Sequence, residues 1–322
     1  MDNQRLFLFV ALSFVMLLLW QSWMEDYGPV ATPESAGTQT QTTTEMLPGS
    51  VPADSDDIPS ASSDSAVQVR ALPETELLKT DRYIEVETDL FKIRIDTTGG
   101  DLRQADLLAY MENTDADSPP FRLLNDSLPN LFVVQSGLRA STGTEPTHHV
   151  VYTAEQTSYR MGEADDKLVV PMTWRSPEGV EVTKRYVFNR GSYAIDLQHE
   201  VRNQSDAEWH GRQYRQLQRT QVAETGQSTF IYTYMGGVIY SPEEKYEKIK
   251  FDDMVEADLD RTITDGWAAM LQHYFLGALV PARGETERYY TKALSNSRYA
   301  IGMISPGQTV APGESALYET RI

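Results

Sequence analysis

VEVTKRYVFNRGSYAIDLQHEV, residues 180–201, is the stretch that decides the fold. Apolar and polar residues alternate along both of its halves, residues 180–188 and residues 193–201. Side chains two residues apart lie on the same face of a β-strand, so each half predicts a strand with one buried face. The Asn-Arg-Gly sequence at residues 189–191 is typical of a turn. The stretch therefore predicts a long β-hairpin.

Similar patterns on both sides of this hairpin extend the prediction to the rest of the domain. Phe91, Ile93 and Ile95 alternate with charged residues, and Thr98-Gly99-Gly100 interrupts the strand that they predict. Repeated short strands separated by Pro and Gly turns favour an antiparallel sandwich. The shorter strand candidates are Leu131–Val134, Leu168–Val170, Thr229–Tyr234, Ala300–Ile304 and Ser315–Tyr318.

One segment of the domain predicts a helix. Its apolar residues follow the i, i+3, i+4, i+7 spacing of an amphipathic helix, with Asp265 as its N-cap and Pro281 after its end. We interpret this stripe as core that packs against a sheet, and a groove for a partner is the alternative. The stripe consists of Trp267, Met270, Leu271, Tyr274 and Ala278.

The N-terminus predicts a membrane anchor. Residues 6–24 are mostly apolar, and their length lies at the boundary between a spanning helix and a signal-peptide core, so length alone does not decide. Trp20 and Trp23 lie where an interfacial aromatic belt is expected, which favours an anchor. A cleaved signal peptide is the alternative, but the apolar run is not closely followed by a small-x-small cleavage site. Arg5 precedes the run and two acidic residues follow it, so residues 1–5 are expected in the cytoplasm and the remainder outside.

Composition separates a tether from a folded domain. Residues 25–80 are rich in Ser, Thr, Pro and Gln and predict a flexible linker, and residues 81–322 predict the extracytoplasmic β domain. The chain has a net charge of −19 and no cysteine. Nucleic-acid binding is therefore not expected, because phosphate contacts need Lys and Arg, and thiolate chemistry is excluded.

The sequence contains no recognisable catalytic or phosphate-binding motif, and we expect no enzymatic activity, cofactor or metal. His148 and His149 are adjacent, but two ligands need further ones to hold a metal, so an exposed loop pair is the prediction. His199 shares the apolar face of its strand and is expected to lie in the core or at an edge. The acidic pairs at residues 243–244 and 252–253 flank lysines and aromatics and predict a solvated loop or short helix.

Four stretches together resemble one family, the YidC branch of the YidC/Oxa/Alb membrane protein insertases. The order and spacing of the stretches are similar to the N-terminal half of the Gram-negative form, over essentially all 322 residues. They are MDNQR at residues 1–5 with WQSW at 20–23, TGGDL at 98–102 with LLAY at 107–110, YSPEEKYEK at 240–248 with KFD at 250–252, and GWAAMLQHYF at 266–275.

The resemblance implies an inner-membrane protein with one N-terminal helix and a periplasmic β-supersandwich of the mutarotase type. It implies a role in inserting and folding membrane proteins, with nascent membrane proteins, the bilayer and the Sec translocon, through its subunit SecF, as partners. The third stretch lies in the region implicated in that contact, so Tyr240, Tyr246 and Phe251 are the proposed contact residues, unless they fill the domain's own core.

Two further expectations follow from the resemblance. The membrane helices that carry insertion in the family follow the periplasmic domain, so we expect this chain to be either a fragment or a natural truncation. The alternative function is a periplasmic carbohydrate-binding or mutarotase-like module on a membrane anchor. That function needs an acid and a base that face each other across a cleft, and no such pair can be chosen from the sequence.

Overall fold

The computed structural model describes residues 57–59, 82–141, 143–222, 234–272 and 274–322. All of them belong to one compact unit, Gly49–Ile322. The predicted anchor at residues 6–24, with Trp20 and Trp23, lies outside the described residues, as does most of the strand predicted at residues 229–234. Within the part of the chain that is described, no helix is long and apolar enough to cross a membrane.

The predicted hairpin is confirmed. It consists of β8 (Val180–Asn189) and β9 (Ile195–Asn203), which pair antiparallel from Val180 opposite Asn203 to Phe188 opposite Ile195. Buried and partly exposed residues alternate along both strands, as the sequence pattern requires. Gly191 has a φ of 69° in the connecting turn, a conformation that glycine adopts without strain.

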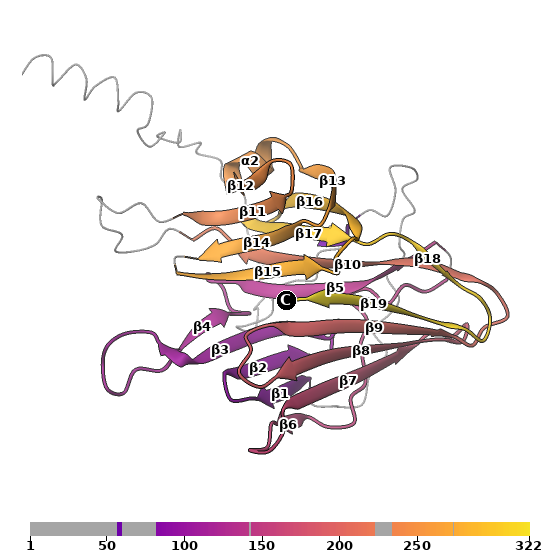
Figure 1. The fold of residues 1–322 in the computed structure, drawn as a ribbon, viewed down its shortest axis with the longest axis horizontal. Helices are drawn as coiled ribbons and strands as arrows, with labels where there is room; N and C mark the ends of the chain where they lie inside the picture. Colours follow the sequence, from indigo (N-terminus) through magenta and orange to yellow (C-terminus); the bar gives the residue numbers. More distant parts are fainter. Residues whose placement is uncertain (1–56, 60–81, 142, 223–233, 273) are drawn as a thin grey trace, which may run out of the picture. The chain divides into compact units, whose positions relative to one another are not determined.

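This hairpin lies in a sheet of eight strands. In Figure 1 the strands run side by side from β12 near the top to β7 near the bottom, and all their pairings are antiparallel. Their order is β12 (Lys245–Ile249), β11 (Met235–Ser241), β14 (Trp267–Gln272), β15 (Phe275–Pro281), β19 (Ser315–Arg321), β9, β8 and β7 (Lys167–Arg175).

A second sheet contains eleven strands. It is antiparallel except for the pairing of β1 with β6. The main order is β13 (Asp260–Thr264), β16 (Thr286–Leu294), β17 (Arg298–Ile304), β10 (Trp209–Thr220), β5 (Phe132–Ala140), β3 (Asp101–Met111), β2 (Phe91–Asp96), β1 (Tyr83–Glu87) and β6 (Ser158–Arg160). In addition, β18 (Gln308–Val310) pairs with β10, and β4 (Pro120–Leu124) pairs with β3.

The two sheets pack face to face, and side chains of both form one apolar core. Tyr186 of β8 donates a hydrogen bond to the carbonyl oxygen of Gly100, and Thr320 of β19 donates one to the side chain of Gln213 in β10. Gly99 and Gly100 have positive φ angles and form the predicted turn between β2 and β3. The fold is therefore mainly β, an antiparallel β-supersandwich as predicted.

Two buried ion pairs interrupt this apolar core. Lys184 donates a hydrogen bond to the carbonyl oxygen of Gly99, and its Nζ lies 3.8 Å from Asp101 Oδ1. Arg215 donates a hydrogen bond of 2.5 Å to Glu287 Oε1. Burial lowers the pKa of Lys184 to about 8 and raises the pKa of Glu287, because both charged forms are poorly solvated there.

The helix predicted from Trp267 to Ala278 is wrong. The segment forms two antiparallel strands, β14 and β15, with Ala268 opposite Leu279 and Gln272 opposite Phe275. The described residues contain one helix, α2 (Phe251–Glu256), in the stretch where a solvated loop or short helix was expected. The strands predicted near residues 131–134, 168–170, 300–304 and 315–318 correspond to parts of β5, β7, β17 and β19.

Candidate functional site

Three aromatic side chains form a row across neighbouring strands at one end of the eight-stranded sheet. Tyr240 of β11 lies opposite both Tyr246 of β12 and Trp267 of β14. The rings of Tyr240 and Trp267 are stacked, with centroids 5.7 Å apart and an interplanar angle of 4°. Directly opposed residues in a sheet share a face, so these three side chains form one surface, which we call the aromatic platform.

The aromatic platform is accessible. Tyr246 is 48% exposed, and β12 is the edge strand of its sheet. Arg261 of β13 donates hydrogen bonds to Glu247 and Glu244 beside it, and the hydrogen bond from Arg261 lowers the pKa of Glu247. Arg261 thus pairs with both acids beside the platform.

Phe251 does not belong to the aromatic platform. It is the first residue of α2, is 4% exposed, and packs against Tyr299 with ring centroids 4.6 Å apart. The burial of this ring favours the alternative stated above, in which Phe251 fills the core of its own domain. The contact proposal retains Tyr240 and Tyr246, and the structure adds Trp267.

This difference in burial predicts a difference in stability. We expect Phe251→Ala to destabilise the fold by about 3 kcal/mol, because it leaves a cavity beneath α2. Tyr246→Ala is expected to cost less than about 1 kcal/mol, since an exposed ring loses few contacts. Urea unfolding followed by far-UV circular dichroism measures both. Equal shifts of the two midpoints would contradict the burial described here.

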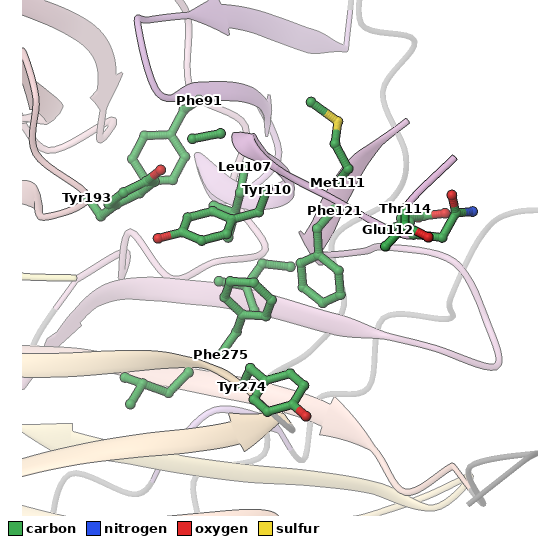
Figure 2. Close-up of a pocket in the computed structure, with 14 residues that line it drawn as sticks. Phe91, Leu107, Tyr110, Met111, Glu112, Thr114, Phe121, Tyr193, Tyr274 and Phe275 are labelled. Carbon is green, nitrogen blue, oxygen red and sulfur yellow. The ribbon is translucent and has the colours of Figure 1, made fainter. Parts of the chain in front are cut away.

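A second aromatic surface lines a cleft of about 970 Å³ between β3, β4 and β15. Figure 2 shows the rings of Tyr110, Phe121 and Phe275 close together in this cleft. Phe121 and Phe275 stack with centroids 4.3 Å apart, and Tyr110 meets Phe275 edge to face at 5.3 Å. Phe91 and Tyr193 form a further edge-to-face pair at 5.3 Å. The cleft thus offers an apolar, aromatic lining.

Among the described residues that line the cleft, the titratable side chains other than tyrosines reduce to one carboxylate, Glu112, and no described histidine is among them. Proton transfer to and from a sugar requires an acid and a base within hydrogen-bonding distance of the reacting atoms. The described lining is therefore suited to contact an apolar group, and its described residues offer no acid–base pair.

The environment predicted for His199 is confirmed, whereas the one predicted for His148 is not. His199 is fully buried and its Nδ1 lies 2.8 Å from Gln213 Nε2, as expected for a core histidine. His148 is 1% exposed, so the prediction of an exposed loop pair is wrong for it. Its burial results from Tyr214, whose Oη accepts the backbone N–H of His148 at 2.9 Å, and from Gly99, which lies against its carbonyl.

The arrangement of the sheets defines the fold class. The structure is similar to that of a galactose mutarotase related enzyme from Lactobacillus acidophilus, with a TM-score of 0.50 and 9% sequence identity, over 74% of this chain and 96% of that one. At this identity the similarity concerns the fold alone. The fold is thus an antiparallel β-supersandwich of the mutarotase type.

The sequence comparisons identify the family. The family model described as the YidC periplasmic domain matches residues 83–322. A protein from Alkalilimnicola ehrlichii named membrane protein insertase YidC is 42% identical, over 100% of this chain and 56% of that protein. One of the same name from Methylococcus capsulatus is 41% identical, over 100% and 57%. The chain belongs to the YidC family, and it spans a little over half the length of these relatives.

Proposed function

We propose that this chain is the membrane-tethered periplasmic part of a membrane protein insertase of the inner membrane. The observation that supports this most is the match to the YidC family over the whole chain, since both relatives described above carry the name insertase. The parent protein would move apolar segments of new proteins into the bilayer, where their backbone polar groups must be paired internally. Residues 6–24 would anchor the chain with a cytoplasmic N-terminus.

The periplasmic domain would act by docking a partner, a subunit of the Sec translocon. The aromatic platform supports this role, because it offers the exposed ring of Tyr246 on the edge strand β12, beside the half-buried rings of Tyr240 and Trp267. Aromatic residues are enriched among those that contribute most to binding at protein interfaces. Exposed lysines at residues 245, 248 and 250 alternate with acids in the same stretch, so the rim of the platform is polar and carries both charges, as interface rims commonly do.

A co-purification experiment tests the docking. We expect Tyr246→Ala and Tyr240→Ala, placed in the full-length protein, to reduce recovery of Sec subunits at least about fivefold, the effect of losing about 1 kcal/mol at an interface. Tyr110→Ala is the matched control, because Tyr110 is 47% exposed but lies in the aromatic cleft. Unchanged recovery in the platform variants, or an equal loss in the control, would contradict docking at the platform.

The insertase role has its own test. Full-length protein that carries this chain should restore insertion of a single-span test protein in cells depleted of their own YidC insertase. Protease accessibility of the test protein from the periplasmic side measures insertion. Failure to restore insertion, with the protein present at normal levels in the membrane, would contradict the proposal.

A further inference from the structure

Three potential metal ligands converge on the outer face of the eleven-stranded sheet. Asp57 Oδ1 lies 3.0 Å from Nε2 of His148 and 3.0 Å from Nε2 of His149. These three atoms all lie within 4.8 Å of one another. Asp57 is 91 positions before His148 in the chain, so their approach is a product of the tertiary fold.

The two histidines are positioned by the loop between β5 and β6. His148 Nδ1 lies 2.6 Å from Tyr214 Oη, which also accepts the backbone N–H of the same residue. In the tautomer with its proton on Nδ1, His148 donates to Tyr214 and directs the lone pair of Nε2 toward Asp57. Histidine ligands of metals commonly donate their second N–H to an oxygen in this way.

The loop itself is closely packed against the turn before β3. The backbone N–H of Gly99 donates to the carbonyl oxygen of Val150 at 2.7 Å. A Cβ on Gly99 would lie 2.4 Å from the carbonyl oxygen of His148, so the close approach depends on glycine. The imidazoles are therefore held by a fixed backbone.

Asp57 is also fixed. Its backbone carbonyl accepts a hydrogen bond of 2.9 Å from Gln216 Nε2, and the carbonyl of Pro59 accepts one of 2.7 Å from Arg139. Between them, Ile58 packs against a small apolar cluster that contains Tyr214 and Tyr290. A segment inside the range predicted as a flexible tether is thus seated on the sheet and directs its carboxylate toward both imidazoles.

One atom of the cluster lacks a hydrogen-bonding partner. Nε2 of His148 is fully buried, and among the described residues it makes no hydrogen bond, although it lies 3.0 Å from the Asp57 carboxylate. Buried ring nitrogens are normally satisfied. An ion bound between the carboxylate and the imidazoles would supply the missing interaction, and this feature separates the cluster from an ordinary buried Asp–His pair.

We propose that Asp57, His148 and His149 form a site for a divalent transition-metal ion, Zn²⁺ in the first instance, which fixes residues 57–59 to the domain. Zn²⁺ binds imidazole nitrogen and carboxylate oxygen at about 2.0–2.2 Å. A tetrahedral site with such bonds separates its ligand atoms by about 3.4 Å, so small side-chain shifts suffice. His149 is 28% exposed, which leaves water access to a fourth position.

The donor set determines which ions fit. Imidazole suits Zn²⁺, Cu²⁺ and Ni²⁺, whereas Ca²⁺ and Mg²⁺ prefer an all-oxygen shell. The site therefore offers one carboxylate oxygen and two ring nitrogens, a mixed donor set that favours these transition metals.

Calorimetric titration of Zn²⁺ into the untagged, chelator-treated 322-residue chain in detergent tests the proposal. We expect one ion per chain, an affinity at least about tenfold weaker in His149→Ala and in Asp57→Asn, and no competition from Mg²⁺. Asp57→Asn keeps the size and hydrogen-bonding ability of the side chain but removes its charge. His210→Ala is the matched control, since His210 is exposed and bonds to Thr309, and it should bind as the parent does.

Three outcomes would overturn the proposal: no saturable binding, equal affinity in His149→Ala, or effective competition by Mg²⁺. X-ray absorption at the zinc edge of the loaded parent chain gives a measurement that does not depend on the folding of any variant. Two imidazoles and one carboxylate oxygen in the first shell are expected, and a shell of water oxygens alone would also overturn it.

Discussion

Arg215→Met is expected to destabilise the domain by about 4 kcal/mol, because it leaves a buried carboxylate without its cation. Arg215 on β10 and Glu287 on β16 are both almost fully buried on the face that packs against the eight-stranded sheet. They form a hydrogen-bonded ion pair. Arg215 Nε and Nη1 and Glu287 Oε2 have no hydrogen-bonding partner among the described residues, so the pair itself is poorly compensated.

The double variant Arg215→Met/Glu287→Leu is the decisive control. Replacing both partners by apolar residues removes both desolvation costs, so its stability should lie within about 1–2 kcal/mol of the parent and above that of the single variant. Urea unfolding of the 322-residue chain in detergent measures all three proteins. If the double variant is as unstable as the single one, the loss comes from packing and the electrostatic explanation is wrong.

The stability of the Arg215→Met variant should also depend on pH. Burial raises the pKa of Glu287, and Arg215 opposes this rise, so removal of Arg215 raises the pKa further. A carboxyl group with a raised folded pKa stabilises the fold while it is protonated, and this contribution is lost as pH rises through the folded pKa. We therefore expect the Arg215→Met variant to have a higher free energy of unfolding at pH 5 than at pH 8. The difference between these two pH values should be smaller in the parent protein.

The hairpin, the element that the sequence predicted in most detail, has one buried face and one partly exposed face. Residues 180–201 lie in β8 and β9, whose outer face is partly exposed, so the side-chain period of two is visible in the sequence. β14 differs, because it lies between β11 and β15 and residues 268–270 are all buried. A strand buried on both faces gives a continuous apolar run, which periodicity alone does not distinguish from a helix.

One residue in the mispredicted segment carried a usable signal. Gly277 would weaken the interior of a helix, and in the structure it lies in β15 where an added Cβ would be 3.1 Å from the ring of Phe132. A glycine within an apolar run thus marked a close approach between two sheets. Gln272 is the last residue of β14 and Phe275 the first of β15, so the reversal occupies the middle of the predicted helix.

The sites could be predicted less well than the strands, because their residues come from distant parts of the chain. The aromatic cleft combines Tyr110, Phe121, Tyr193 and Phe275 from four separate segments, and no spacing in the sequence connects them. Asp57 lies in a stretch whose composition predicts a linker. The contacts of residues 57–59 with Tyr214, Gln216 and Arg139 are needed to show which acidic residue of this stretch lies next to His148 and His149. Tyr240 and Tyr246 were found through the family resemblance.

Alkaline pH is expected to unfold the domain cooperatively between about pH 10.5 and 11.5, through its buried tyrosines. Seven tyrosines are buried, and in six of them burial raises the pKa far above the ordinary value of 10, because the phenolate is poorly solvated in the core. These six are Tyr152, Tyr186, Tyr214, Tyr289, Tyr290 and Tyr318, and the seventh buried tyrosine is Tyr299.

The sign follows from proton linkage. Below pH 10 these hydroxyls are protonated in both states, and above it the unfolded chain loses protons that the folded chain keeps, so stability falls. At pH 11 each of these six tyrosines lowers the free energy of unfolding by about 1.4 kcal/mol. Together they lower it by roughly 8 kcal/mol, which is comparable with the whole stability of a typical domain. Lys184 has the opposite effect, because its lowered pKa makes stability rise with pH between about pH 8 and 10.5. This single group offsets only part of the loss caused by the six tyrosines.

Phenolate absorbance and far-UV circular dichroism, recorded together against pH, measure the effect. We expect the exposed tyrosines to ionise first and the remaining absorbance to rise together with the loss of β signal. Tyr152→Phe should move the midpoint to higher pH at little cost at neutral pH, since the Tyr152 hydroxyl has no hydrogen-bonding partner among the described residues. Tyr246→Phe, at an exposed position, should leave the midpoint unchanged. Ionisation of all 17 tyrosines near pH 10 with an intact β spectrum would show that the buried hydroxyls are not protected by the fold.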